Sequence, residues 1–181
     1  MRILCPASCA ELKDMLQWAV QEYDGPAAIR YPRGGDRKYR DSDWNCGLDS
    51  GVKCHRKGND YTLITYGTLV DNVLDAADIL AERGIEVTVL RLLTVAPLPT
   101  DEIVSWLPAK KKILIAEEAC GGIHEALAWE LRQRIPACEI ECIDLGNQYV
   151  THGSVNDLYK KYGMDADSIA EKVQEVLAVE N

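Results

Sequence analysis

The chain has 181 residues, 47% of them hydrophobic and 27% charged, which suits one globular domain, or one domain with a piece of another. The formal net charge of −9 argues against a nucleic-acid partner, because neutralising phosphates needs clustered lysine and arginine. The sequence has no apolar stretch of about 20 residues that could span a membrane and no secretory pattern at its start, so we expect a cytoplasmic protein.

Residues 2–5 and 27–31 predict two short strands, and Ser8 and Glu11 between them have the spacing of a capping box at the start of a helix. Two strands and one helix cannot bury both faces of a sheet, so this unit should dock on something else. Its open strand edge is expected to be disordered or paired with another copy. Because Met1 falls directly on the first strand, we expect a shortened chain or one product of a split gene.

A polar, glycine-rich stretch over residues 36–58 carries both charge signs and predicts a linker, with a possible strand near residues 51–55. Long connections of this kind mark domain boundaries. The linker would divide the chain into an N-terminal unit, residues 1–35, and a larger domain, residues 59–181.

The larger domain opens with a second βαβ unit. An apolar run over residues 61–66 predicts a strand, and residues 70–81 repeat apolar side chains at the period of one helix face. Gly84 stops this helix, and residues 86–92 predict a second strand, parallel to the first. The turn at Gly67 lacks the glycine fingerprint of dinucleotide-binding proteins, which disfavours a stand-alone nucleotide-binding domain.

Strands and helices alternate to the end of the chain. Further strands are predicted at residues 113–116 and 139–145, the first being a continuous apolar run typical of a strand covered on both faces. Further helices are predicted over residues 101–107, 123–134, 155–162 and 167–179. This order predicts an α/β fold, in which a mostly parallel sheet carries helices on both faces.

Polar residues near strand ends are candidates for chemistry. Glu117 and Glu118 lie where α/β sheets carry their sites, but adjacent strand residues point to opposite faces, so a turn-capping or interface role is favoured over catalysis. Gly121-Gly122 fits a tight strand-to-helix turn better than a phosphate-binding loop. No nucleophile motif accompanies His152. We therefore predict no catalytic residue.

The seven cysteines are a second candidate set. Their two close pairs, Cys5 with Cys9 and Cys138 with Cys142, are spaced CxxxC rather than CxxC, and the three histidines are scattered among them. We expect reduced, mostly buried thiols and no metal site.

The stretch AIRYPRGG places Arg30 and Arg33 at the end of the second predicted strand, beside glycines that admit close backbone approach. Arginine forks suit the oxygens of phosphates and carboxylates. From the residues alone, an anion-binding pair and a pair of exposed arginines that solvate a strand end are equally good interpretations.

Six segments, each weak alone, follow one another in a specific order and spacing over nearly the whole chain. They are CPASCAELKDMLQWAV, GPAAIRYPRGG, ITYGTLVDNVLDAADIL, VLRLLTVAPL, AEEACGGIHEAL and THGSVNDLYKKYGMDADSIAEKV. Together they resemble the transketolase superfamily, and within it the 1-deoxy-D-xylulose-5-phosphate synthases. AIRYPRGG and THGS favour these synthases over transketolase itself and over the decarboxylating subunits of 2-oxo acid dehydrogenases.

The resemblance implies an enzyme that uses thiamine diphosphate and Mg²⁺ to join decarboxylated pyruvate to glyceraldehyde 3-phosphate, a step that feeds isoprenoid, thiamine and pyridoxal synthesis. Residues 1–35 resemble the last βαβ unit of the pyrimidine-binding domain, and residues 59–181 the C-terminal domain. The GDG…N metal motif and the cofactor-activating glutamate are missing, so no cofactor or metal is expected on this chain. Arg33 resembles the arginine that grips the substrate phosphate, and Arg30 is a second candidate.

The resemblance implies a C-terminal fragment that is inactive alone and supports dimer assembly. Its expected partners are the missing N-terminal domains of the same enzyme and a second copy in a homodimer, with neither nucleic acid nor membrane. The alternative is a non-catalytic assembly subunit of a split transketolase or of a related 2-oxo acid dehydrogenase component.

Overall fold

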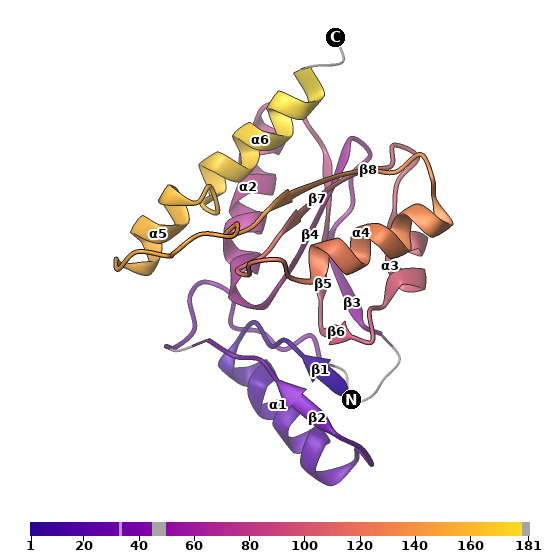
Figure 1. The fold of residues 1–181 in the computed structure, drawn as a ribbon, viewed down its shortest axis with the longest axis vertical. Helices are drawn as coiled ribbons and strands as arrows, with labels where there is room; N and C mark the ends of the chain where they lie inside the picture. Colours follow the sequence, from indigo (N-terminus) through magenta and orange to yellow (C-terminus); the bar gives the residue numbers. More distant parts are fainter. Residues whose placement is uncertain (33, 45–49, 179–181) are drawn as a thin grey trace.

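The computed structural model describes residues 1–32, 34–44 and 50–178, and the described strands form two sheets (Figure 1). The larger sheet has five described strands, each parallel to its neighbours except the antiparallel edge strand β3. In spatial order they are β3 (Val52–Arg56), β5 (Val87–Leu92), β4 (Tyr61–Tyr66), β7 (Lys112–Ala116) and β8 (Glu139–Ile143). The expected α/β fold with a mostly parallel sheet is therefore confirmed.

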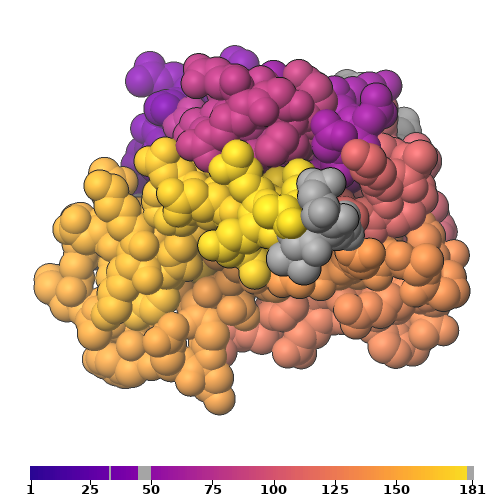
Figure 2. All heavy atoms as spheres, turned by 90° about the horizontal axis from the view of Figure 1, so that it is seen from above, coloured from indigo at the N-terminus to yellow at the C-terminus, as the bar shows by residue number. Residues whose placement is uncertain are grey.

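Helices cover both faces of the larger sheet, because alternate strand residues point to opposite sides. Leu63 and Val89 belong to a core formed with α2 (Val70–Glu82), α5 (Val155–Lys161) and α6 (Ala166–Ala178). The neighbouring residues Ile64 and Leu90 belong to a core formed with α3 (Thr100–Trp106) and α4 (Ile123–Arg134). Figure 2 shows the C-terminal segment, in yellow, lying against the magenta surface of α2.

The boundaries of these elements follow local signals in the sequence. Gly84 adopts φ 77° just after α2, a left-handed conformation that costs glycine little, so it ends the helix as predicted. The possible strand near residues 51–55 is β3. Among the described helices, none is long and apolar enough to cross a membrane.

The N-terminal unit consists of β1 (Arg2–Leu4), α1 (Cys9–Gln21) and β2 (Ala27–Ile29), and it lies at one end of the larger sheet (Figure 1). The oxygen of Ser8 accepts a hydrogen bond from the N–H of Glu11, 3.1 Å away, which confirms the predicted helix start. β1 and β2 are parallel, as a βαβ unit requires.

The open edge of β1 is occupied by β6 (Thr94–Ala96), a short strand that follows β5 and pairs with β1 antiparallel. The N–H of Cys5 continues this pairing by donating to the carbonyl of Leu93, 2.9 Å away. The expectation that this edge is disordered or paired with another copy is therefore wrong. The unit completes its sheet with a strand from the larger domain.

The segment 36–44 runs from the N-terminal unit onto the first turn of α2. The N–H groups of Lys38 and Tyr39 both donate to the carboxylate of Asp71, at 3.0 and 2.8 Å. The guanidinium of Arg37 donates to the side chain of Asn72, 3.2 Å away. These contacts fix the path of the described part of the range 36–58, and its assignment as an interdomain linker stays a prediction.

A fully buried ion pair joins the N-terminal unit to the larger sheet. The guanidinium of Arg91, on β5, donates to both carboxylate oxygens of Glu11, on α1, at 2.7 and 2.8 Å, and both side chains are 0% exposed. Arg91 also donates to Asp43, 2.7 Å away. Such a pair overcomes its desolvation penalty only with every partner in place. Because Glu11 and Asp43 come from outside the larger domain, the pair depends on how the parts are assembled.

Replacing Glu11 by glutamine should lower the free energy of unfolding by about 3 kcal/mol, because it leaves the buried guanidinium of Arg91 without its countercharge. The amide has the shape of the carboxylate, but in either orientation its NH₂ group faces two donors, one from Arg91 and one backbone N–H. Urea unfolding measures the change. Asp78→Asn, which disrupts an exposed ion pair with Arg56, is the control and should cost less than about 1 kcal/mol. If both variants lost the same free energy of unfolding, the buried ion pair would contribute no more to stability than the exposed one.

Candidate functional site

A small cavity lies where the N-terminal unit meets the larger sheet, and its volume is about 210 Å³. Its polar lining comes from residues at the carboxyl ends of four strands. Cys5 follows β1, Arg30 follows β2, Tyr66 ends β4 and Glu118 lies just beyond β7. The carboxyl ends of parallel strands are where α/β proteins place their ligands, so this cavity, called here the arginine pocket, is the candidate binding site.

Arg30 is oriented by both halves of the structure. Its backbone N–H donates to the carbonyl of Leu4, 2.8 Å away, which extends the pairing of β1 and β2. Its guanidinium donates to the hydroxyl of Tyr66 at 2.9 Å and to the carbonyl of Glu118 at 3.2 Å. The guanidinium carbon also lies 5.1 Å from the centre of the Tyr66 ring. The structure thus places Arg30 in a pocket, as an anion-binding role requires.

Arg33, the residue singled out for phosphate binding, lies outside the described residues. Its neighbours Pro32 and Gly34 line a second cavity of about 270 Å³, which shares Tyr31, Pro32 and Thr68 with the arginine pocket. Pro32, just before Arg33, therefore lines both cavities, and Gly34, just after it, lines the second one. The role of Arg33 itself stays a prediction.

Tyr66 connects Arg30 to a buried carboxylate. Its hydroxyl donates to Oε2 of Glu117, 2.9 Å away, while it accepts from Arg30. Burial is the main reason that the pKa of Tyr66 is raised, and the negative charge of Glu117 adds to the effect against the opposing charge of Arg30. The phenol therefore stays protonated and keeps donating, so Tyr66 is a positioning group and not a general base.

Glu117 organises the turn between β7 and α4. It is almost fully buried, and its oxygens accept the backbone N–H groups of Ile123 and His124, at 3.0 and 3.1 Å, in the first turn of α4. These N–H groups have no partner within the helix, so a carboxylate there both caps it and complements its dipole. The structure agrees with the predicted turn-capping role. No motif in the sequence connects this carboxylate with Tyr66, which the sequence marks only as the end of a strand.

The remaining polar candidates have other surroundings. The carboxylate of Glu118 accepts a hydrogen bond from the hydroxyl of Tyr159, on α5. His152 is exposed, and its role stays a prediction. Burial raises the pKa of the Cys5 thiol to about 12, against the opposing charges of Arg30 and Arg91, so this thiol remains protonated near neutral pH and is a poor nucleophile. The geometry suits the binding and orientation of an anion better than covalent chemistry.

Comparison with known proteins identifies the family. Residues 50–169, well over half of the chain, match the family model described as "Transketolase, C-terminal domain". The chain belongs to the transketolase C-terminal domain family. The match begins just before β3, so this edge strand belongs to the family domain although its residues fall within the range predicted as a linker.

Curated relatives of this transketolase-type chain are named 1-deoxy-D-xylulose-5-phosphate synthase. The chain is 34% identical to the protein from Chlorobium phaeovibrioides and 33% identical to that from Gloeothece citriformis. The alignments cover 96% and 94% of this chain, but 28% of each relative. The chain thus spans little more than a quarter of the length of the curated relatives it matches, and it resembles their C-terminal portion.

Solved transketolases share the fold of this chain. A structure described as "Split gene transketolase, inactive beta4 tetramer" matches all of this chain and 58% of its own with a TM-score of 0.83 and 24% sequence identity. A transketolase mutant from Pichia stipitis matches 98% of this chain and 25% of its own, with a TM-score of 0.73 and 17% identity. Both matches extend over the N-terminal unit as well as the family domain, so the arrangement of the two sheets is shared.

Full-length enzymes of the transketolase family depend on thiamine diphosphate and a metal ion. A Mg²⁺ ion that holds a diphosphate takes oxygen ligands in octahedral geometry. Among the described residues, three metal-binding side chains converge at one place, and they are Glu117, His124 and Cys142. A thiol and an imidazole do not suit that ion. This cluster of the described residues therefore does not suit the Mg²⁺ ion that a bound diphosphate requires.

Replacing Gly122 by alanine should lower the free energy of unfolding by about 1–3 kcal/mol, the usual cost of overpacking a buried site. A Cβ atom at Gly122 would lie 2.4 Å from Oε2 of Glu117, the atom that accepts from Tyr66 and from the first turn of α4. Urea unfolding tests this. Gly35→Ala is the matched control, because its added Cβ would have no atom within 4 Å. A Gly122→Ala variant as stable as the control would mean that the Glu117 carboxylate is not held where we describe it.

Proposed function

We propose that this chain forms the C-terminal part of a thiamine-diphosphate-dependent 1-deoxy-D-xylulose-5-phosphate synthase, which converts pyruvate and glyceraldehyde 3-phosphate to 1-deoxy-D-xylulose 5-phosphate and CO₂. The observation that carries the proposal is that relatives with this name align with almost the whole chain, the N-terminal unit included, at 33–34% identity. The chain alone is inactive, because the cluster of potential metal ligands among its described residues does not suit the Mg²⁺ ion that thiamine diphosphate requires.

The chain contributes to substrate binding through the arginine pocket. Glyceraldehyde 3-phosphate carries a phosphate, and a guanidinium fork held at strand ends is a suitable partner for phosphate oxygens. Arg30 is oriented from one side by Tyr66 and from the other by the carbonyl of Glu118. Among the described residues, these two oxygens are the acceptors of the Arg30 guanidinium. Its remaining N–H groups are therefore available to donate to a ligand. Arg33, which follows the lining residue Pro32 in the sequence, supplies a second positive charge.

The partners of the chain are the remaining domains of the same enzyme, which hold thiamine diphosphate and Mg²⁺, and a second copy in a homodimer. The larger domain supports this assembly, and the N-terminal unit brings the arginines to the shared active site. Thiamine diphosphate supplies the group that takes up the two-carbon unit of pyruvate. The residues of this chain bind and orient the phosphate end of the acceptor aldehyde.

The proposal is tested by assaying the purified chain with pyruvate, glyceraldehyde 3-phosphate, thiamine diphosphate and Mg²⁺. The chain alone should form no product above background. The chain should then be assembled with the polypeptide from the same organism that carries the cofactor-binding domains. This assembly should form 1-deoxy-D-xylulose 5-phosphate and release CO₂. Turnover by the chain alone would contradict its inactivity, and an active assembly that leaves pyruvate unchanged would contradict the proposed reaction.

A second candidate is a non-catalytic subunit of a split transketolase or of a related 2-oxo acid dehydrogenase component. The match to a structure described as an inactive split-gene transketolase tetramer, over the whole of this chain, favours this alternative. The same assembled enzyme distinguishes the two functions. A transketolase would transfer a two-carbon unit from a ketose phosphate to an aldose phosphate without consuming pyruvate.

In the assembled enzyme, Arg33→Ala should raise KM for glyceraldehyde 3-phosphate by the equivalent of roughly 1.5–3 kcal/mol, about 10- to 150-fold, because a charge-assisted contact with the phosphate is lost. KM for pyruvate, which has no phosphate, should change little. Arg132→Ala, at an exposed position on α4, is the matched control and should alter neither constant. An unchanged KM for glyceraldehyde 3-phosphate would assign Arg33 a structural role.

A further inference from the structure

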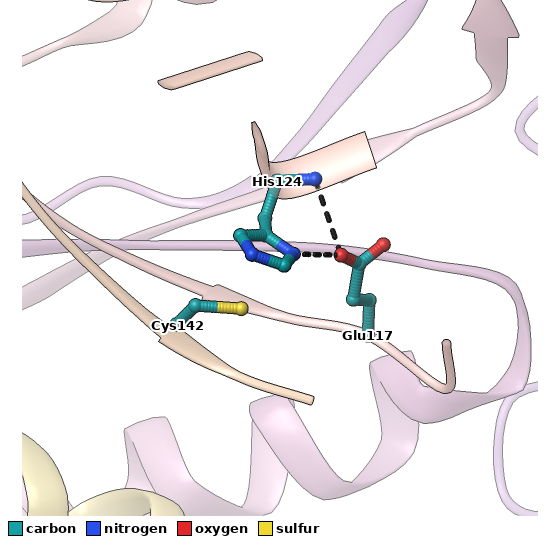
Figure 3. A group of neighbouring side chains, drawn as sticks. All are labelled: Glu117, His124 and Cys142. Atoms are coloured by element: carbon teal, nitrogen blue, oxygen red, sulfur yellow. Dashed lines mark hydrogen bonds and ion pairs between the residues drawn. The ribbon is translucent and has the colours of Figure 1, made fainter. Parts of the chain in front are cut away.

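Three side chains from separate parts of the chain converge near the carboxyl ends of β7 and β8 (Figure 3). Glu117 follows β7, His124 lies in the first turn of α4 and Cys142 lies on β8. Each offers a metal-binding atom, and these three atoms all lie within 4.8 Å of one another. A fourth group is close, because Oδ2 of Asp144 lies 3.9 Å from Nδ1 of His124.

The donor set matches the chemistry of Zn²⁺. Zinc binds thiolate sulfur at about 2.3 Å and imidazole nitrogen or carboxylate oxygen at about 2.0–2.2 Å, in tetrahedral geometry. Ligand atoms in such a site lie about 3.3–3.7 Å apart, by the geometry of a tetrahedron with those bond lengths. In the structure, Nδ1 of His124 and Oε1 of Glu117 are 2.5 Å apart, and the three donor atoms lie within 4.8 Å of one another. Side-chain shifts of about 1 Å, which separate the hydrogen-bonded pair and bring the thiol closer, would give the spacing of zinc ligands. Mixed sulfur and nitrogen donors favour zinc over Mg²⁺ or Ca²⁺.

The surroundings favour a cation. Four carboxylates surround the Cys142 thiol, and they belong to Glu117, Asp144, Glu125 and Glu141. A dication among these carboxylates would offset their mutual repulsion and stabilise the thiolate. His124 and Cys142 also line an open surface cavity of about 440 Å³, together with Glu125 and Glu141, and this cavity gives an ion a path to the ligands.

We propose that Glu117, His124, Cys142 and Asp144 form a zinc-binding site. Binding replaces the proton shared by Nδ1 of His124 and Oε1 of Glu117 with the metal ion, and the thiol of Cys142 releases its own proton as it becomes a ligand. No electron transfer is involved, and the geometry of Glu117 is already fixed. Its carboxylate is held by Tyr66 and by the backbone N–H of Ile123, as outer groups hold the ligands of metal sites.

The sequence shows no metal-binding motif here, because Cys142 and His124 are 18 positions apart and Glu117 lies seven positions before the histidine. Capping of α4 alone does not account for this cluster of side chains. Capping uses the backbone N–H groups of Ile123 and His124, and it requires neither the imidazole of His124 nor the thiol of Cys142.

The test uses the full chain, stripped of metal with a chelator and then titrated with Zn²⁺ against a chromophoric competitor. One equivalent should bind, and Mg²⁺ should not compete. Co²⁺ in the same site should give a thiolate-to-cobalt charge-transfer absorption. Losing a residue that only hydrogen-bonds to a metal ligand lowers metal affinity by roughly 10- to 100-fold. Cys142→Ser and His124→Ala remove ligands themselves, so each should weaken zinc binding by more than this. Cys142→Ser should also abolish the charge-transfer absorption.

Cys120→Ser and His152→Ala are the matched controls. Cys120 is an exposed thiol three residues after Glu117, and His152 is an exposed histidine, so neither change should alter the affinity or the absorption. The absence of stoichiometric binding, an absorption that survives Cys142→Ser, or one that disappears with Cys120→Ser would overturn the proposal. Zinc-edge X-ray absorption on the unmodified chain needs no variant to fold, and it should show one sulfur neighbour among nitrogen and oxygen. A shell without sulfur, or with several sulfurs, would also overturn the site.

Discussion

The buried ion pair between Arg91 and Glu11 is the constraint on which the arrangement of the two sheets depends. A guanidinium that is fully removed from water requires charged partners in place, and here they come from α1 and from Asp43 in the segment that follows the N-terminal unit. Moving the unit away from β5 would leave a charge buried without its partner. The pair therefore selects one docking geometry, and the short pairing of β1 with β6 supports it.

The position of the arginine pocket follows from this geometry. Arg30 follows β2 and Tyr66 ends β4, and the two side chains meet because the carboxyl ends of these two strands lie close together. Glu117 then extends the hydrogen-bonded chain from Tyr66 to the first turn of α4. A single polar line thus runs from the N-terminal unit through the end of the sheet, which ties the orientation of Arg30 to the packing of the family domain.

The sequence predicted the features that arise from local periodicity, and it missed those that arise from contacts between distant segments. The strands around Leu63 and Val89 and the helix that ends at Gly84 could be read directly from their patterns. β6 could not be predicted, because three residues before a proline form a strand here only by pairing with β1. Arg91 looked like one polar residue in an apolar strand, and its role appears only with Glu11 in place. Arg30 could be named as a candidate from its place at a strand end, while Tyr66 gave no signal beyond ending a strand.

The shared strand of the smaller sheet has a consequence for how the pocket can work. One wall of the pocket carries Arg30 and the other carries Tyr66. The pairing of β1 with β6 and the buried ion pair hold these walls together, so they cannot move apart in a hinge motion. The opening has a width that is set when the protein folds. A rigid pocket of this kind would select ligands by the size and charge that its entrance admits. Any movement that closes the pocket over a ligand would have to come from another chain.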